Sequence, residues 1–413
     1  MHNDVDDGPM TDSTAAVAAP ALSVAVIGAG ARSYIARHVS AAREDARVVA
    51  VVDTTEIGRE RARSNFPEAT IYSDLSELLA AGGIQAAIVT TPDNTHEAIA
   101  VELLKAGIAV YLEKPLAISL EGADHVLTTA AETGTPLYVG HNMRHSGVVR
   151  TMREIIERGE IGEVKAVWVR HFVGNGGDYY FKDWHADRSK TGTLLLQKAS
   201  HDIDVVHYLA SGFTRRVVGM GDLMIYGDIT DRRDRSGEMM PDWFSFDNWP
   251  PKSQTGLNPV VDVEDVSMMM MTLDNGVQAS YQQCHFTPDY WRNYTVIGTE
   301  GRLENFGDTA GGVVRVWNRR HEWQPEGDVE YPIEGVTSGH ADADLLTMTE
   351  FLDHVLDGSP TVVSPIAARE AVAAGSLAAE SLRSGSVPFT VPELPDHVLA
   401  HFSHAPAPER TSR

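Results

Sequence analysis

Three features are scarce in this chain of 413 residues, and each scarcity excludes a class of protein. Cysteine occurs once, as Cys284, which excludes an internal disulfide and a multi-cysteine metal site. Lysine and arginine number 34 against 58 acidic residues, and the net charge of -24 disfavours nucleic acid and membrane, whose phosphates it repels. No run of about 18 apolar residues occurs, so no transmembrane helix is expected. A small molecule is therefore the expected partner.

The two ends of the chain differ in composition from the rest. The stretch before the alanine-rich residues 11–22 is acidic, whereas a secretory signal begins with a basic region. We expect residues 1–20 and 403–413 to be disordered tails and the protein to be cytoplasmic. The 43% of hydrophobic residues is typical of a globular protein, and the length suffices for two domains.

Segments typical of strands and of helices alternate between Leu22 and Gly140. The expected strands are 23–27, 47–53, 84–90, 109–112 and 136–140, and the expected helices are 31–42, 57–65, 96–106 and one that begins after Ser119. This alternation predicts an α/β domain with a doubly wound parallel sheet over residues 21–145.

Longer strand patterns follow after about residue 146. The expected strands are 164–172, 217–224, 266–273, 277–284, 294–297 and 313–317, and helices are expected at 148–158, 342–356 and 365–382. Asn275-Gly276 predicts a tight hairpin between two of these strands. Residues 146–402 are therefore expected to form an α+β domain with a mainly antiparallel sheet.

One long segment, residues 227–263, lacks periodicity. It contains the aromatic residues Trp243, Phe244, Phe246 and Trp249, which argue against plain disorder. A segment of this length in a compact domain is usually functional or disordered. We expect either an ordered flap over the substrate pocket or a subunit contact, with equal weight.

A glycine-rich turn follows the first expected strand. Gly28 permits the tight turn and Gly30 permits close approach of a pyrophosphate, while Ala31, Arg32 and Ser33 open the next helix. Asp53 ends the second strand, where an acid receives ribose hydroxyls and repels a 2′-phosphate; the neutral Thr54 follows it. The pattern predicts NAD rather than NADP, and Asp53 as a solvated acid is the alternative.

The carboxyl ends of two later strands carry polar residues, and ligands bind at such ends. The first group is Thr91, Pro92, Asn94 and His96, and the second is Glu113-Lys114-Pro115. For His96, a local packing role in the first turn of a helix is an equally good explanation as a role in ligand binding. A half-buried Lys114 beside a cationic nicotinamide would have a lowered pKa, which suits it to orient a substrate hydroxyl and move its proton.

The second domain offers Lys198 and His201 near a helix start. The reference pKa of histidine lies near neutral pH, so His201 is suited to act as a base, with a capping or core role as the alternative. Asp204 is expected to be structural. His185 and His207 lack the close spacing of metal ligands, so no metal is expected.

Together these motifs resemble the Gfo/Idh/MocA family over residues 22–385. Further matches are Asn142 with Arg144, Gly159-Glu160-Ile161-Gly162, and Gly298-Thr299-Glu300-Gly301. The resemblance implies a Rossmann domain, a second domain with an open sheet that often forms dimers or tetramers, and a carbohydrate substrate. It also implies that Lys114 and His201 are catalytic. Site residues expected on the same ground are Asn142 and Trp184 for the cofactor and Arg144, His185 and Lys198 for the substrate.

The chain departs from that family at one position. Gln197 stands where the family often has a carboxylate, four residues before the histidine. Either Lys114 and His201 suffice for catalysis or Lys198 joins them, and Lys198 is also suited to bind an acidic group on the sugar. The leading hypothesis is an NAD-dependent sugar, glycoside or polyol dehydrogenase. The alternatives are an NAD-dependent glycoside hydrolase and a non-catalytic NAD sensor.

Overall fold

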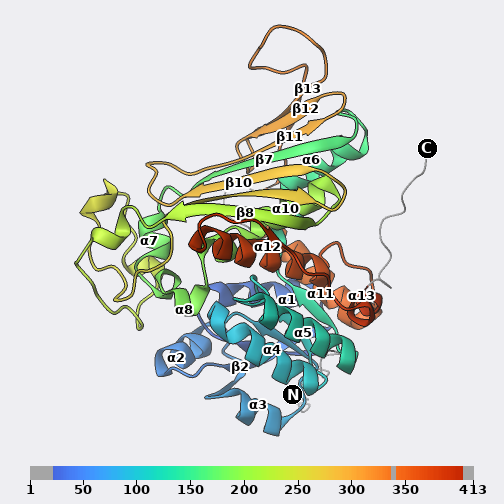
Figure 1. The fold of residues 1–413 in the computed structure, drawn as a ribbon. Coiled ribbons are helices and arrows are strands. Elements are labelled where there is room, and N and C mark those ends of the chain that lie inside the picture. Colours follow the sequence, from blue (N-terminus) through green and yellow to red (C-terminus); the bar gives the residue numbers. More distant parts are fainter. Residues whose placement is uncertain (1–21, 336–340, 403–413) are drawn as a thin grey trace, which may run out of the picture.

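A computed structural model describes residues 22–335 and 341–402, which form two sheets with helices around and between them (Figure 1). The tails expected at 1–20 and 403–413 lie outside these residues. None of the described helices is long and apolar enough to cross a membrane.

The first sheet has six parallel strands in the order β3-β2-β1-β4-β5-β6. They are β1 (Leu22–Ile27), β2 (Ala46–Val52), β3 (Thr70–Tyr72), β4 (Ala86–Val89), β5 (Ala109–Leu112) and β6 (Leu137–Val139). The order reverses between β1 and β4, which is where such sheets bind ligands. The predicted doubly wound sheet is confirmed; β3, a short and partly exposed edge strand, was not predicted.

Apolar side chains cover this sheet on both faces. One cluster includes residues of α3 (Leu75–Ala81), α4 (His96–Lys105) and α5 (Leu120–Thr133). The other includes residues of η1 (Ala31–His38), α1 (Val39–Ala42) and α2 (Glu56–Asn65). The predicted helix over 31–42 is thus a 3-10 helix followed by one α-helical turn. Ser119 caps α5 as expected, accepting a hydrogen bond from the Gly122 amide.

The second sheet has nine strands in the order β14-β13-β12-β11-β7-β10-β9-β8-β15. They are β7 (Val164–Phe172), β8 (Thr214–Asp222), β9 (Val266–Leu273), β10 (Gln278–Cys284), β11 (Trp291–Gly298), β12 (Arg302–Phe306), β13 (Val313–Trp317), β14 (Val329–Pro332) and β15 (Phe389–Thr390). Among the described strands of this sheet only β7 and β10 pair in parallel, so the mainly antiparallel sheet is confirmed.

Helices cover one face of the second sheet. Residues of α6 (Gly147–Glu157), α10 (Ser200–Ala210) and α12 (Pro365–Arg383) pack with the inward side chains of the strands. Helix α12 lies between the sheet and the first domain (Figure 1). The opposite face exposes Trp168, Met220, Met268 and Met270.

Two C-terminal helices return to the first domain. In α11 (Ala341–Asp357), Met348, Phe351 and Leu352 belong to the apolar cluster that includes Tyr138. In α13 (Asp396–Phe402), Val398 belongs to the cluster that includes α5 residues. The predicted domain boundary at 145/146 divides the chain in sequence, but two helices from the second part, α11 and α13, pack on the Rossmann domain.

Candidate active site

The glycine-rich turn after β1 has the geometry of a dinucleotide cradle. Gly28 has φ +93°, and a Cβ atom there would lie 2.8 Å from the Thr91 Cγ2 atom. At Gly30 a Cβ would meet nothing within 4 Å, so this backbone faces open space. Ser33 is buried, and its hydroxyl donates to the Gly30 carbonyl at 2.8 Å. A close backbone approach to a pyrophosphate fits this arrangement.

Asp53 lies beside the turn, as predicted. Its Oδ2 atom accepts the Ala29 amide at 2.8 Å, and its Oδ1 atom accepts the amide and hydroxyl of Thr55 at 2.9 and 2.7 Å. A Cβ at Gly58 would lie 2.1 Å from the carboxylate, so glycine leaves room for it. The Oδ1 atom thus accepts two hydrogen bonds and the Oδ2 atom one, so Oδ2 keeps the capacity to accept from a ribose hydroxyl. Thr54 is exposed next to it.

His96 joins the two polar loops. Its Nδ1 atom lies 2.8 Å from the Pro115 carbonyl and its Nε2 atom 3.0 Å from the Thr91 carbonyl. The buried ring thus holds the loop of Thr91, exposed Pro92 and half-buried Asn94 against the Glu113-Lys114-Pro115 loop. These contacts give His96 a positioning role; its contact with a cofactor stays a prediction.

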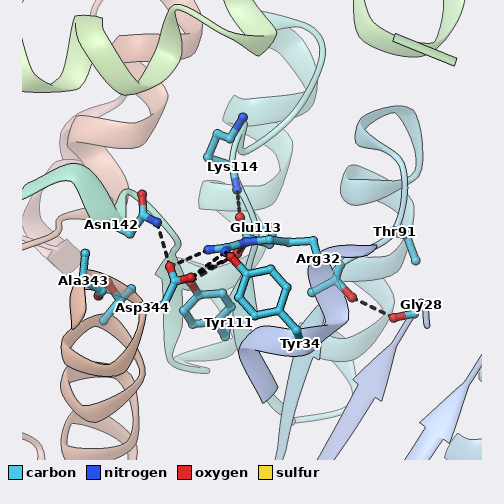
Figure 2. Close-up of polar contacts among 12 residues, drawn as sticks. Gly28, Arg32, Tyr34, Thr91, Tyr111, Glu113, Lys114, Asn142, Ala343 and Asp344 are labelled. Atoms are coloured by element: carbon cyan, nitrogen blue, oxygen red, sulfur yellow. Dashed lines mark hydrogen bonds and ion pairs between the residues drawn. The ribbon is translucent and has the colours of Figure 1, made fainter. Parts of the chain in front are cut away.

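A polar network connects the glycine turn to the C-terminal helix α11 (Figure 2). The Arg32 guanidinium donates to Glu113 at 2.7 Å and to both oxygens of the buried Asp344 at 2.7 and 2.8 Å. Asn142 and Tyr34 also donate to Asp344, at 2.7 and 2.9 Å. Arg32, Glu113 and Asn142 are thus brought together as predicted cofactor residues, and Asp344 is a member that the sequence did not suggest.

Lys114 points away from this network and toward the second domain (Figure 2). Its Nζ atom donates to the Gln197 carbonyl at 3.0 Å, and its peptide bond to Pro115 is cis. Burial lowers the pKa of Lys114 below its ordinary value. Asp93, at the neighbouring strand end, is buried too, and burial raises the pKa of that carboxyl. Through its Nζ atom Lys114 thus contacts the segment of the second domain that carries Lys198 and His201.

That segment supplies Lys198 and His201. Gln197 ends α9 (Leu194–Gln197), and His201 lies in the first turn of α10, with its ring 6.4 Å from the His141 ring. Burial, helped by Arg292 and Lys114, lowers the pKa of Lys198 to about 7. Lys198 is therefore easily deprotonated near neutral pH, so it is able to exchange a proton there.

A buried charge cluster, which was not predicted, lies behind Lys198. Asp202 lies 3.2 Å from Arg292 Nε and 3.1 Å from His171 Nδ1, and it accepts from the Tyr294 hydroxyl. Burial alone would raise the pKa of Asp202, but Arg292 and the two hydrogen bonds hold it well below its ordinary value. The sequence pattern of β7 could have indicated that His171 is buried, because His171 alternates with exposed residues in the same way as Val167 and Val169 and shares their face.

Three further predicted site residues have partners of their own. The Arg144 guanidinium donates two hydrogen bonds to the Asp204 carboxylate, at 2.7 and 2.8 Å, and both residues are buried. These bonds do not support the predicted contact of Arg144 with substrate, which stays a prediction. Asp204, which was expected to be structural, accepts these two bonds with its two carboxylate oxygens. The rings of Trp184 and His185 stack with their centroids 3.7 Å apart, and His185 Nδ1 lies 2.6 Å from Asp183 Oδ1.

The fold and this site define a two-domain, dinucleotide-binding protein with ionisable groups at the domain junction. Residues 22–141 match the family described as "Oxidoreductase family, NAD-binding Rossmann fold", and residues 153–391 match "Oxidoreductase family, C-terminal alpha/beta domain". The chain therefore belongs to the Gfo/Idh/MocA family, as its motifs predicted, and its cofactor is NAD.

Individual relatives are more distant. The chain is 32% identical to the inositol 2-dehydrogenase of Burkholderia multivorans over 192 residues, which are 46% of this chain and 54% of that protein. It is 25% identical to the putative oxidoreductase YteT of Bacillus subtilis over 59% of this chain and 66% of that protein. The chain thus spans between about half and two thirds of these curated relatives.

Solved structures support the fold. A levoglucosan dehydrogenase in complex with NADH and levoglucosan superposes with a TM-score of 0.74 at 18% identity. The match covers 90% of this chain and 100% of that one. At this identity the likeness concerns the fold alone.

Proposed function

We propose that this protein is an NAD-dependent dehydrogenase that oxidises a hydroxyl-bearing carbon of a sugar, glycoside or polyol. The observation that carries the proposal is the meeting of Lys114 with the segment of Lys198 and His201 at the domain junction. The family to which the chain belongs, and relatives named as dehydrogenases of inositol and levoglucosan, support the same reaction class.

The residues at the domain junction have different roles in the proposed reaction. Bound NAD supplies the hydride acceptor. Lys114 orients the substrate hydroxyl from the cofactor side, and its lowered pKa reduces the barrier to proton exchange. His201, within the other domain, takes the hydroxyl proton as general base. Lys198 replaces the missing carboxylate at Gln197 as the group that passes this proton onward.

Incubation of the purified protein with NAD and a panel of sugars and polyols tests the reaction. We expect absorbance in the NADH band to rise with at least one of them. Release of sugar from an aryl glycoside without NADH accumulation would instead indicate redox-assisted hydrolysis. Tight NAD binding with no turnover of any substrate would indicate a sensor.

Lys114→Met tests the assignment of the catalytic lysine. We expect kcat to fall by about a thousandfold, within the range for loss of an acid–base group, while the Kd for NAD changes less than about twofold. Lys105→Met is the matched control, because Lys105 is exposed at the end of α4, and its kcat should equal that of the wild type. Unchanged kcat in Lys114→Met would remove this lysine from the mechanism.

We also propose a cytoplasmic location and a homodimer or homotetramer formed through the open face of the second sheet. The exposed Trp168, Met268 and Met270 on that face support the assembly, since clustered apolar side chains are typical of interfaces. A monomeric mass by light scattering would contradict it.

A further inference from the structure

A cavity of about 210 Å³ lies beneath the flap, the segment of residues 227–263. The flap stands at one end of the second sheet, beside α7 (Gly176–Tyr180) and α8 (Arg188–Thr191) (Figure 1). The cavity far exceeds the ~10–15 Å³ that one water requires and is smaller than the ~300–1,000 Å³ of sites for drug-sized ligands. Its size suits one ring rather than an extended molecule.

The polar wall of this cavity is built around Asp178, which is buried. Its Oδ1 atom accepts from Lys182 at 2.8 Å and from Asn248 at 2.7 Å, and its Oδ2 atom accepts from Gln254 at 3.2 Å. Trp243 of the flap donates to the Asp178 carbonyl at 2.8 Å. These bonds fix the flap to α7, and the Lys182–Asp178 pair leaves the wall without net charge.

One acceptor on this wall has no partner. The Oε1 atom of Gln254 is buried and forms no hydrogen bond within the described residues. A buried acceptor of this kind requires a donor, such as a ligand hydroxyl. At Gly177 a Cβ would lie 2.8 Å from the Tyr226 hydroxyl and 2.9 Å from Gln254 Nε2, so the absence of a side chain lets α7 pack closely against both of these lining residues.

Aromatic side chains of the flap form the other wall. Phe246 is 79% exposed and Trp249 is 44% exposed, although both line the cavity. Aromatic rings of this kind bind the apolar C–H faces of sugars, while amides and hydroxyls bind the sugar's O–H groups. The combination of an unpaired amide oxygen, a neutral polar wall and exposed rings selects a neutral, hydroxyl-rich ring.

Helix α7 borders both this cavity and the active site. Asp178 faces the cavity, and two residues later the Tyr180 ring lies 5.8 Å from the Lys198 ammonium. Residues two positions apart on a helix point to different sides, so α7 separates the two sites, and a ligand that occupies both passes around this helix of five residues, which is about 7.5 Å long.

We propose that the cavity beneath the flap is a second carbohydrate subsite, which binds a neutral pyranose ring linked to the sugar that is oxidised. The preferred substrates are then glycosides or disaccharides rather than free monosaccharides. This inference rests on the proposed dehydrogenase function and narrows its substrate class.

Matched substrate pairs test the subsite in the full-length protein with NAD. Glucose is compared with cellobiose and maltose, galactose with lactose, and xylose with xylobiose. We expect a higher kcat/KM for at least one disaccharide. In Trp249→Ala and in Phe246→Ala, the KM for that disaccharide should rise about tenfold, with kcat and monosaccharide kinetics unchanged. Trp323→Ala is the matched control, because Trp323 is 79% exposed outside the flap.

Disaccharide binding is measured separately from turnover, by the change in tryptophan fluorescence that Trp249→Phe abolishes. Binding without NADH formation from any sugar would sustain the subsite and reject the dehydrogenase. Oxidation of monosaccharides with no binding of any disaccharide would overturn the subsite and retain the dehydrogenase. A changed oligomeric mass in Trp249→Ala, with unchanged disaccharide kinetics, would assign these rings to a subunit contact and also overturn it.

Discussion

The two domains build their halves of the site from different materials. The cofactor half uses backbone: a glycine turn with φ +93° at Gly28 and an open face at Gly30, held by Asp53 and by the buried ring of His96. The substrate half uses buried ionisable side chains, of which Lys198 and Asp202 have strongly lowered pKa values. The shape of the cofactor half therefore depends on backbone geometry, whereas the substrate half depends on each buried charge keeping its partner.

This difference predicts how each half fails. A substitution at Gly28 or Gly30 in the cofactor half should weaken binding of NAD without unfolding the domain, because neither position breaks the buried ion pairs that Arg32 forms with Glu113 and Asp344. A substitution in the substrate half should destabilise the fold, because a buried charge that loses its partner is costly.

Asp202→Asn should produce the largest effect on stability. It leaves Arg292 without its buried carboxylate, so the free energy of unfolding in urea should fall by about 3 kcal/mol. The lowered pKa of Asp202 means that its contribution is present above about pH 4, the unfolded value, and is lost as the pH falls further. The difference between variant and wild type should therefore shrink in acid.

Asp45→Asn provides the control for this substitution. Asp45 pairs with Arg43 at 3.1 Å on the surface, where water screens the pair, so its loss should change the free energy of unfolding much less. Equal losses of stability in the two variants would erase the proposed contrast between a buried and an exposed carboxylate.

The sequence predicted the cofactor half well, because its signals are local. Glycine turns, helix caps and short apolar strands depend on neighbouring residues, and Gly28, Asp53 and Lys114 lie where those signals placed them. The network around Asp344 depends on a contact between residues 312 positions apart in the chain, which no local pattern reports.

The substrate half was predicted only in part. Lys198 and His201 were predicted from their place near a helix start. Arg292 and His171 lie on strands, where the alternation of buried and exposed residues indicates burial but not chemistry. Their cluster forms because β7 and β11 pair, with Arg292 opposite His171. Pairing of strands about 120 residues apart is a property of the tertiary fold.

Gly28→Ala tests the dependence of the cofactor half on backbone geometry. Both the positive φ and the 2.8 Å approach to Thr91 oppose a side chain, and the local strain should raise the Kd for NAD at least about tenfold. Gly107→Ala is matched in φ, at +73°, but a Cβ there meets no atom within 4 Å. It should lower stability by about 1 kcal/mol and leave NAD affinity unchanged. Equal NAD affinity in both variants would show that the turn tolerates a side chain.

Lys198→Met should give the smallest but most specific effect. Because the pKa of Lys198 is lowered to about 7, its neutral form increases as the pH rises from 6 to 8, and kcat/KM of the wild type should rise with a midpoint near pH 7. The variant should lack this rise and lose less than about tenfold at pH 8, since Lys114 and His201 remain.

Lys165→Met, at an exposed lysine paired with Glu163, should keep the wild-type pH profile. If the rise persists unchanged in Lys198→Met, the titrating group is another one, such as His201. The substrate half would then resemble the cofactor half more closely, with Lys198 holding the substrate in place and taking no part in proton transfer.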